Sequence, residues 1–120
     1  PIVGSDISRD AVRAATAAAA GSGTDDIIRV VCRDIGDLPP QSTGMVVTNP
    51  PYGERLGDIN ELAGLYKRLG ALLRRSCQGM TAHVMTGSRF LANRIGLSPG
   101  RSDVLWNGPI ECRLLHYDID

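Results

Sequence analysis

Aromatic side chains are scarce in this chain, at 4% of its 120 residues, and neither sign of charge is in excess. Thirteen Lys and Arg balance thirteen Asp and Glu, which excludes a polybasic or an acidic tail. No apolar run approaches the roughly 20 residues of a membrane span, and no signal-peptide pattern opens the chain, so no membrane partner is expected. A composition of 42% apolar and 22% charged residues is typical of one globular domain, here with an aliphatic core.

Cysteine is also rare. Cys32, Cys77 and Cys112 are odd in number, far apart and in no C-x-x-C pair, which argues against a disulfide framework or a zinc site. His83 and His116 have no cysteine or histidine at ligand spacing along the sequence, so we interpret them as ordinary core or surface residues. These features predict a cytoplasmic protein without a metal site.

Apolar runs alternate with helical periodicity along the chain. Short β-branched runs predict strands, and leucines spaced by three or four residues around Tyr66 predict the clearest helix. The predicted strands are Ile2–Ser5, Ile27–Cys32, Gly44–Thr48, Ala82–Met85, Val104–Trp106 and Ile110–Tyr117, and the predicted helices are Asp10–Ala20, Leu62–Leu73 and Ser88–Ile95. Strands alternating with helices indicate an α/β fold with a mostly parallel sheet, and Asn107-Gly108 predicts a C-terminal antiparallel hairpin.

Three predicted strands are followed by a polar residue: Asp6, Asp34 or Asn49. In a parallel sheet the ligand crevice lies beyond the carboxyl ends of the strands, so these side chains should line one edge. A carboxylate can accept hydrogen bonds from both hydroxyls of a ribose. Asp6 alone could instead cap the following helix, but the three together predict a nucleoside-type cofactor.

Asn49-Pro50-Pro51-Tyr52 is the sharpest feature of the sequence. Two consecutive prolines remove two backbone donors and fix φ at about −65°, which makes a rigid corner whose carbonyls can face a ligand. The Asn49 side-chain oxygen and the Pro50 carbonyl would then be two neighbouring acceptors, and these fit the two N–H groups of an exocyclic amine. Tyr52 offers a flat face to a planar base. The simpler alternative is a Pro-Pro loop with a buried tyrosine.

This corner resembles the amino-methyltransferase signature of class I S-adenosylmethionine-dependent enzymes. Four further segments narrow the resemblance to bacterial guanine-N2 methyltransferases of 23S ribosomal RNA. They are Thr48 to Gly57, Leu65-Tyr66, Leu69-Gly70 and Asn107 to Leu115. It covers nearly the whole chain. The resemblance implies a Rossmann-like class I methyltransferase sheet, S-adenosyl-L-methionine as cofactor, a ribosomal RNA substrate, and an RNA-binding THUMP domain upstream.

The resemblance also implies a cofactor site. Asp6, with Ile7 beside it, matches the acid that holds the cofactor ribose. Asp34, with Ile35 beside it, matches the acid that contacts the adenine ring, and Asn49 is expected to contact the cofactor as well.

Asn49, Pro50, Pro51 and Tyr52 match the catalytic motif that receives the target amino group. By this resemblance Asn49 and Pro50 orient the amine for direct methyl transfer, and Tyr52 stacks on the extruded guanine. Arg55 lies beside the motif and is expected to contact RNA.

The chain departs from the family pattern at its start. It begins without Met, inside the apolar run at Ile2, and the family's glycine-rich cofactor loop on the preceding strand is missing. Gly21-Ser22-Gly23 follows a predicted helix, and we interpret it as a helix stop at Gly21 rather than as that loop. We therefore expect residues 1–120 to be the C-terminal part of a single S-adenosylmethionine-dependent methyltransferase domain, inactive alone.

Three alternatives stay open. Methyltransferases acting on adenine N6 or on glutamine N5 share such a corner, although the continuation to Gly57 and the ending Glu111–Leu115 favour the guanine enzymes. Residues 54–94 hold seven basic and three acidic groups, which could track phosphates or form a solvated helix face. The chain could also be an inert fragment whose exposed sheet edge pairs with a second copy.

Overall fold

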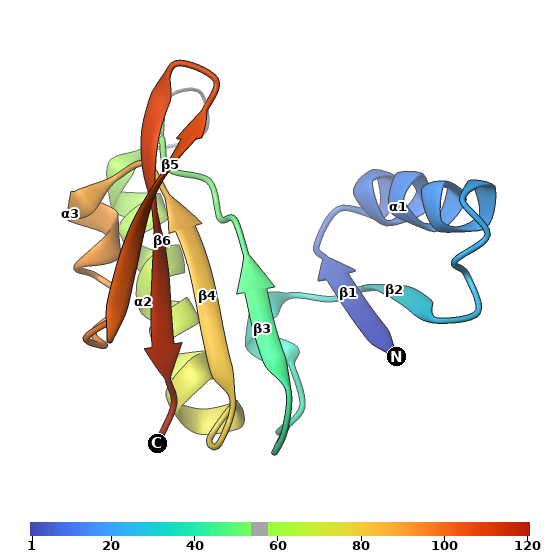
Figure 1. The fold of residues 1–120 in the computed structure, drawn as a ribbon, viewed down its shortest axis with the longest axis horizontal. Helices are drawn as coiled ribbons and strands as arrows, with labels where there is room; N and C mark the ends of the chain where they lie inside the picture. The colour runs from blue at the N-terminus through green and yellow to red at the C-terminus, as the bar shows by residue number, and fades with distance from the viewer. Residues whose placement is uncertain (54–57) are drawn as a thin grey trace. The chain divides into compact units, whose positions relative to one another are not determined.

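The computed structural model describes residues 1–53 and 58–120, and its strands and helices alternate along the chain (Figure 1). The chain divides into two units, residues 1–38 and 39–120, and each is taken by itself. Helix and strand content confirms the predicted α/β class.

The first unit is a β-α-β motif. Strand β1 (Ile2–Asp6) pairs in parallel with β2 (Ile28–Cys32), and helix α1 (Arg9–Gly21) connects them. Ser8 is the N-cap of α1, and its hydroxyl accepts the Ala11 amide. The predicted stop at Gly21 is wrong by two residues: Gly21 ends the helix, Ser22 is its C-cap, and Gly23 takes the positive φ of 73°. A short 3-10 helix, η1 (Ile35–Asp37), follows β2.

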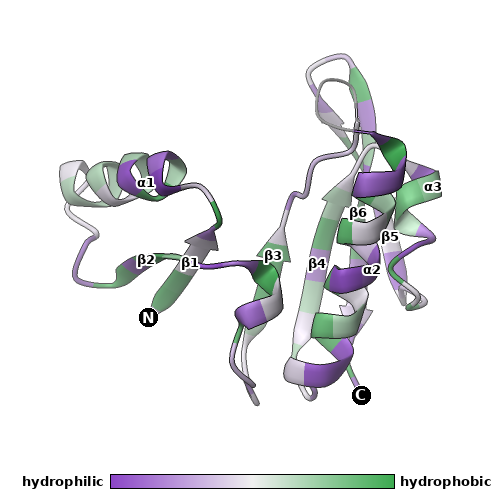
Figure 2. Ribbon diagram, turned by 180° about the vertical axis from the view of Figure 1, so that it is seen from behind, coloured by the Kyte–Doolittle hydropathy of each residue, from purple (hydrophilic) through white to green (hydrophobic). Residues whose placement is uncertain are grey.

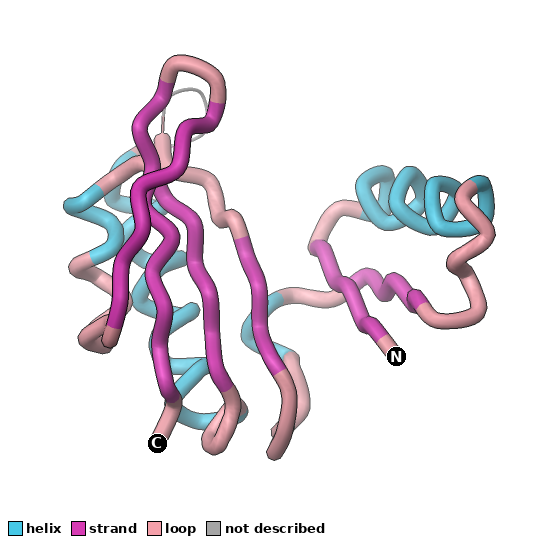
Figure 3. Tube along the Cα trace, viewed as in Figure 1, coloured by secondary structure: helices cyan, strands magenta, loops and turns pink. Residues whose placement is uncertain are grey.

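The second unit is a four-stranded sheet covered on one face by helices. It contains β3 (Met45–Thr48), α2 (Ile59–Ser76), β4 (Thr81–Thr86), α3 (Arg89–Ala92), β5 (Arg101–Asn107) and β6 (Ile110–Asp118). The strand order is β3-β4-β6-β5, with β3 and β4 parallel and β6 antiparallel to both β4 and β5. The β5–β6 pair is the predicted C-terminal hairpin, seen in the tube of Figure 3.

Each unit is described with its own strand pairs. Within the described residues, β1 pairs with β2, and β3 pairs with β4, so the strands form two sheets. The sequence pattern predicts where strands occur, but backbone pairing depends on which strands become neighbours in space, and no local pattern encodes that.

The core of the second unit lies between α2 and the sheet. The helix begins at N-cap Asp58, and its predicted apolar face is buried; Figure 2 shows apolar and polar residues alternating along it. The buried helix side chains are those of Leu62, Tyr66, Leu69, Leu72 and Leu73. Across from them β4 alternates, so that Ala82, Val84 and Thr86 are buried and the residues between them are partly exposed. No helix in the described part of the chain is long and apolar enough to cross a membrane.

We predict that two copies of this chain associate through the outer edge of β3. Among the described residues β3 has β4 as its neighbour on one side only, and it carries no charged side chain. Met45 and Val47 are 62% and 70% exposed. An uncharged strand edge is a template for pairing with another chain. Residues 1–120 are therefore expected to show, in light scattering, a mass above the 12.8 kDa of one chain.

Val47→Lys is the matched variant, because a lysine on an edge strand opposes edge-to-edge pairing. It should return the mass to that of a monomer without changing the circular dichroism spectrum. A wild-type chain that stays monomeric at millimolar concentration would show that this edge does not pair.

Candidate active site

The Asn49–Tyr52 corner begins directly after β3 ends at Thr48. Asn49 is exposed, and in the described residues its side chain makes no hydrogen bond. Pro50, Pro51 and Tyr52 are half-buried. The corner therefore presents a free carboxamide next to a backbone fixed by two prolines.

The Tyr66 side chain contacts the backbone of the corner at Pro50. This residue of α2 is fully buried, and its hydroxyl lies 3.5 Å from the Pro50 carbonyl oxygen and 2.8 Å from the Thr86 hydroxyl. Thr86 in turn accepts the Ser88 amide at 3.2 Å. Both hydroxyls are satisfied together when Thr86 donates to Tyr66 and Tyr66 donates to Pro50. One lone pair of the Pro50 carbonyl then remains for a ligand.

Burial raises the pKa of Tyr66 above its ordinary value, which exceeds the opposing effect of the Thr86 hydrogen bond. The phenol therefore stays protonated at neutral pH. A neutral phenol can donate to the carbonyl, whereas a phenolate could not.

Tyr52 is held by the hairpin. The Asn107 side-chain amide donates to the Tyr52 hydroxyl at 2.6 Å, and Cys112 Sγ lies 3.5 Å from the same oxygen. The ring packs on Gly87, where a β-carbon would come within 2.8 Å of two ring carbons. The ring orientation is thus fixed by residues up to 60 positions away in the sequence.

Asp6 is the last residue of β1, and Asp34 lies two residues beyond the end of β2, the neighbouring parallel strand of the first unit. Asp6 pairs with Cys32 in the β1–β2 register, and its backbone oxygen accepts the Arg33 amide. One carboxylate oxygen of Asp6 accepts the Ser8 amide at 2.8 Å, and Asp34 accepts the Gly36 amide at 2.7 Å. Each carboxylate is thus oriented by a backbone hydrogen bond two residues on. Asp6 is not the N-cap of α1, since Ser8 takes that position.

The isoleucines beside these acids lie near the surface. Ile7 is 70% exposed, and Ile35 is half-buried at the start of η1. The four predicted cofactor residues of the first unit therefore come together at the carboxyl ends of β1 and β2. Their alignment with Asn49 in the second unit stays a prediction, and Arg55 lies outside the described residues.

Sequence patterns did not identify Tyr66, Thr86, Gly87 and Asn107 as parts of the corner. Tyr66 fits the buried helix face as well as a leucine would, and Asn107 fits a turn. The available signal was a phenol within an otherwise aliphatic helix face, because a buried hydroxyl needs a hydrogen-bond partner.

The two histidines contact each other, which their spacing along the sequence did not reveal. His83 and His116 face each other across β4 and β6 with 2.7 Å between their Nδ1 atoms, and His116 Nε2 lies 2.8 Å from Asp103. His83 Nε2 is buried and has no hydrogen-bond partner among the described residues. Hydrogen bonds from Arg101 and His116 hold the pKa of Asp103 below its ordinary value. Within the described residues, no group of three or more His, Cys, Asp or Glu could hold a metal ion.

Comparison with known proteins places these features in a family. Residues 1–116 match the family model described as RMKL-like, methyltransferase domain. A ribosomal RNA large subunit methyltransferase K/L from Syntrophotalea carbinolica is 43% identical over 123 residues, covering 98% of this chain and 17% of that protein. The protein of the same name from Methylococcus capsulatus is 41% identical over 120 residues, covering 99% and 16%.

Solved structures share the fold. SMU.472, complexed with SAH, superposes with a TM-score of 0.93 at 23% identity, covering 99% of this chain and 32% of that one. A predicted N6-adenine-specific DNA methylase from Listeria monocytogenes gives a TM-score of 0.85 at 27% identity, covering 99% and 30%. The chain thus spans about a sixth of the curated relatives and about a third of these structures. By its match over residues 1–116, the chain belongs to the RMKL-like methyltransferase domain family.

Proposed function

We propose that residues 1–120 are the C-terminal part of an S-adenosylmethionine-dependent methyltransferase domain that methylates N2 of a guanine in 23S ribosomal RNA. The observation that carries the proposal is the corner itself, where an unbonded Asn49 carboxamide adjoins a Pro50 carbonyl with one lone pair left. Two fixed acceptors side by side suit an amine with two N–H groups. The names of the 43% and 41% identical relatives support ribosomal RNA as the substrate.

The residues of the first unit fit the cofactor. Asp6 is held by the Ser8 amide through one oxygen, and in the described residues its second oxygen is left for a ribose hydroxyl. Asp34 stands at the end of the neighbouring strand, where it suits the adenine end of the same molecule. Ile7 and Ile35 supply apolar surface beside the two acids. When bound, S-adenosyl-L-methionine supplies an electrophilic methyl group on a sulfonium.

Asn49 and Pro50 act on the amine rather than on the cofactor's methyl group. Each accepts one N–H, which turns the nitrogen lone pair toward the methyl carbon and stabilises the positive charge that develops on nitrogen. Tyr52 stacks on the extruded base and keeps it in the plane that the two acceptors require. Among the described residues the corner contains no strong base, so the proton that the nitrogen loses after methylation would pass to solvent, and positioning and hydrogen bonding supply most of the rate.

A second candidate is methylation of adenine N6. It is favoured by the 27% identity to a protein named as an N6-adenine-specific DNA methylase. Adenine N6 and the amide of glutamine N5 both carry two N–H groups, so the corner alone does not choose among the amines. The relatives that are more similar to this chain carry a ribosomal RNA name, and this supports the guanine assignment.

The setting we propose is the cytoplasm, with an RNA-binding THUMP domain in the full-length protein. Cys32, Cys77 and Cys112 are free thiols, as a reducing compartment would keep them. Burial raises the pKa of the Cys77 thiol, so this cysteine stays protonated and unreactive.

The test is methyl transfer by the full-length protein to 23S ribosomal RNA, with nucleoside mass spectrometry of the product. N2-methylguanosine is the expected product, and calorimetry should show S-adenosylhomocysteine binding. Methyl incorporated into duplex DNA but not into the RNA would support the adenine alternative and overturn the guanine one. The same calorimetry on residues 1–120 alone tests whether this part binds cofactor; we expect it not to.

Tyr66→Phe is expected to lower kcat about tenfold while the KM for cofactor stays unchanged. The variant keeps the buried ring but removes the donor to Pro50, so the carbonyl loses its fixed direction. Loss of one buried hydrogen bond should cost roughly 1 kcal/mol of stability. Steady-state kinetics and thermal unfolding on the same samples separate the two effects.

Thr86→Val is the partner variant, because in the described residues Thr86 is linked to Pro50 through the Tyr66 hydroxyl. If Tyr66 is a positioning residue, the losses in kcat of the two variants should be strongly non-additive in the double variant. Additive losses in kcat, or a loss of stability with unchanged kcat, would contradict the role.

A further inference from the structure

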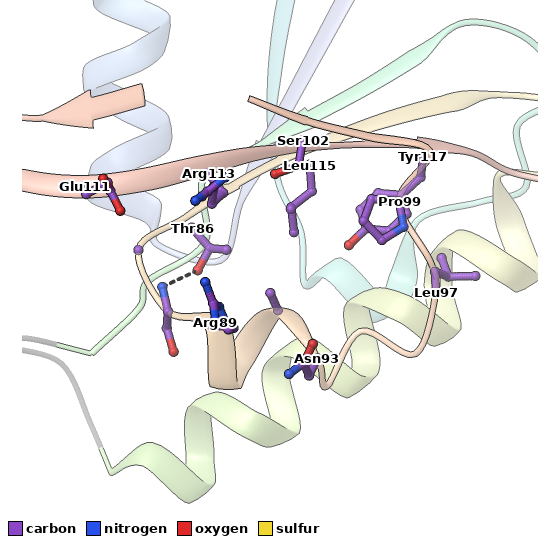
Figure 4. Close-up of a pocket in the computed structure, with 13 residues that line it drawn as sticks. Thr86, Arg89, Asn93, Leu97, Pro99, Ser102, Glu111, Arg113, Leu115 and Tyr117 are labelled. Atoms are coloured by element: carbon purple, nitrogen blue, oxygen red, sulfur yellow. Dashed lines mark hydrogen bonds between the residues drawn. The ribbon is translucent and has the colours of Figure 1, made fainter. Parts of the chain in front are cut away.

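A pocket of about 410 Å³ lies between α3 and the hairpin strands of the second unit (Figure 4). Its floor is the face of β6 that carries Arg113, Leu115 and Tyr117, and its wall is the segment from Thr86 through α3. Its volume is within the range of small-ligand sites. None of the residues predicted from the sequence as site residues lines it.

The pocket has two chemically different ends. Figure 4 shows Arg89 and Arg113 with Glu111 at the end near Thr86, and Leu97 and Pro99 beside the Tyr117 ring at the other end. Burial raises the pKa of Tyr117 to about 12, so its phenol carries no charge at neutral pH. One end is therefore charged and the other is apolar and aromatic.

Both arginines are available to a ligand. They are exposed, and in the described part of the chain neither guanidinium makes an ion pair or a hydrogen bond. They reach the pocket from different elements, Arg89 from α3 and Arg113 from β6. Two guanidinium groups facing one space favour an anion, and their planar geometry suits phosphate oxygens.

The pocket also adjoins the Asn49–Tyr52 corner. Gly87 lines the pocket, and the Tyr52 ring packs directly on it. Thr86 lines the pocket too, and its hydroxyl is bonded to the Tyr66 phenol that supports Pro50. If one nucleotide of an RNA strand is bound at the corner, the adjacent nucleotide would therefore lie over Gly87.

We propose that this pocket binds a ribonucleotide adjacent to the methylated base, with a backbone phosphate on Arg89 and Arg113 and the sugar or base against Leu97 and Pro99. The inference rests on the proposed function insofar as the neighbouring corner holds an RNA base. S-adenosylmethionine has no phosphate, so the arginines are assigned to the RNA and not to the cofactor. Glu111 opposes the anion and limits the affinity of the pocket.

The test is equilibrium binding of the full-length protein to a transcribed domain of 23S ribosomal RNA over a range of salt concentrations. Arg89→Ala and Arg113→Ala should each weaken binding roughly five- to tenfold and lower the salt slope by about 1, as expected for one lost phosphate contact. Glu111→Gln should tighten binding roughly two- to threefold, because a like charge near the phosphate is removed. Arg89→Lys and Arg113→Lys keep the charge and should retain most of the salt slope.

Arg94→Ala is the matched control. Arg94 follows α3, stacks on the Phe90 ring and does not line the pocket, yet its loss changes the net charge equally. Its salt slope should equal that of the wild type. A short single-stranded oligoribonucleotide and inorganic phosphate serve as competitors: competition by the oligonucleotide is expected, and competition by phosphate alone at equal concentration would overturn a nucleotide site in favour of a simple anion site.

The outcome is separable from the proposed function. Unchanged affinity and salt slope in Arg89→Ala and Arg113→Ala would overturn the pocket while methyl transfer stands. An Arg94→Ala effect equal to theirs would also overturn it, since net charge would then explain all three. If the wild type binds the RNA with the expected pattern but transfers no methyl group, the proposed function fails and the pocket stands.

Discussion

Asn49→Ala is expected to lower kcat for methyl transfer by about 10²- to 10³-fold, the range for removing one hydrogen bond that strengthens in a transition state. The variant deletes one of the two acceptors that hold the amine, and the Pro50 carbonyl alone orients the amine less well and stabilises less of the positive charge that develops on nitrogen. Asn49 is exposed and makes no hydrogen bond within the described residues, so the free energy of unfolding should hardly change. Single-turnover kinetics measure the chemical step, and calorimetry with S-adenosylhomocysteine separates it from any loss of cofactor affinity.

Asn60→Ala is the control for this variant. Asn60 is exposed in the first turn of α2. Its backbone amide donates a hydrogen bond to Asp58, and an alanine at this position keeps that hydrogen bond. Asn49→Asp should fall between the wild type and Asn49→Ala, because a carboxylate still accepts from the amine. If Asn49→Ala kept more than about a third of the wild-type kcat, the corner would not be the catalytic site.

The backbone of the corner was predictable from the sequence because it is determined locally, whereas its catalytic role stays a prediction. Two prolines after an apolar strand fix the backbone whatever surrounds them, and Asn49 and Tyr52 are adjacent to them. The buried stripe of α2 was predictable for the same reason, since a 3.6-residue period depends on the helix alone.

What supports the corner was not predictable, because it comes from distant segments. Tyr66 reaches Pro50 from α2, and Asn107 reaches Tyr52 across 55 positions in the sequence. The contact between the two histidines was not predictable for the same reason. His83 and His116 are 33 residues apart, and only the antiparallel register of β4 and β6 puts them opposite each other. A pairing of this kind is set by the register of the sheet, which no local spacing reveals.

Gly70→Ala is expected to destabilise the chain more than any other conservative change in α2. Gly70 is buried in the middle of the helix, and a β-carbon there would lie 1.8 Å from the Ile95 carbonyl oxygen and 2.8 Å from its carbon. Both atoms are backbone, so relief requires α2 to move away from the segment that follows α3. Overpacking of this kind costs about 1–3 kcal/mol and occasionally more, which exceeds the gain of up to about 1 kcal/mol in helix propensity from replacing glycine.

Gly64→Ala provides the matched control in the same helix. No atom of the described residues lies within 4 Å of the β-carbon it would add, so it should stabilise the chain by about 0.5–1 kcal/mol through helix propensity alone. Chemical denaturation of the two variants should therefore shift the midpoint in opposite directions. Arg74 links α2 to the same segment, because its guanidinium donates to the Ile95 and Gly96 carbonyls at 3.3 Å. If Gly70→Ala pushes that segment away from α2, these two hydrogen bonds should be lost as well. If Gly70→Ala were as stable as Gly64→Ala, α2 would not approach Ile95 closely enough to require glycine, and the position of α3 against α2 would have to be revised.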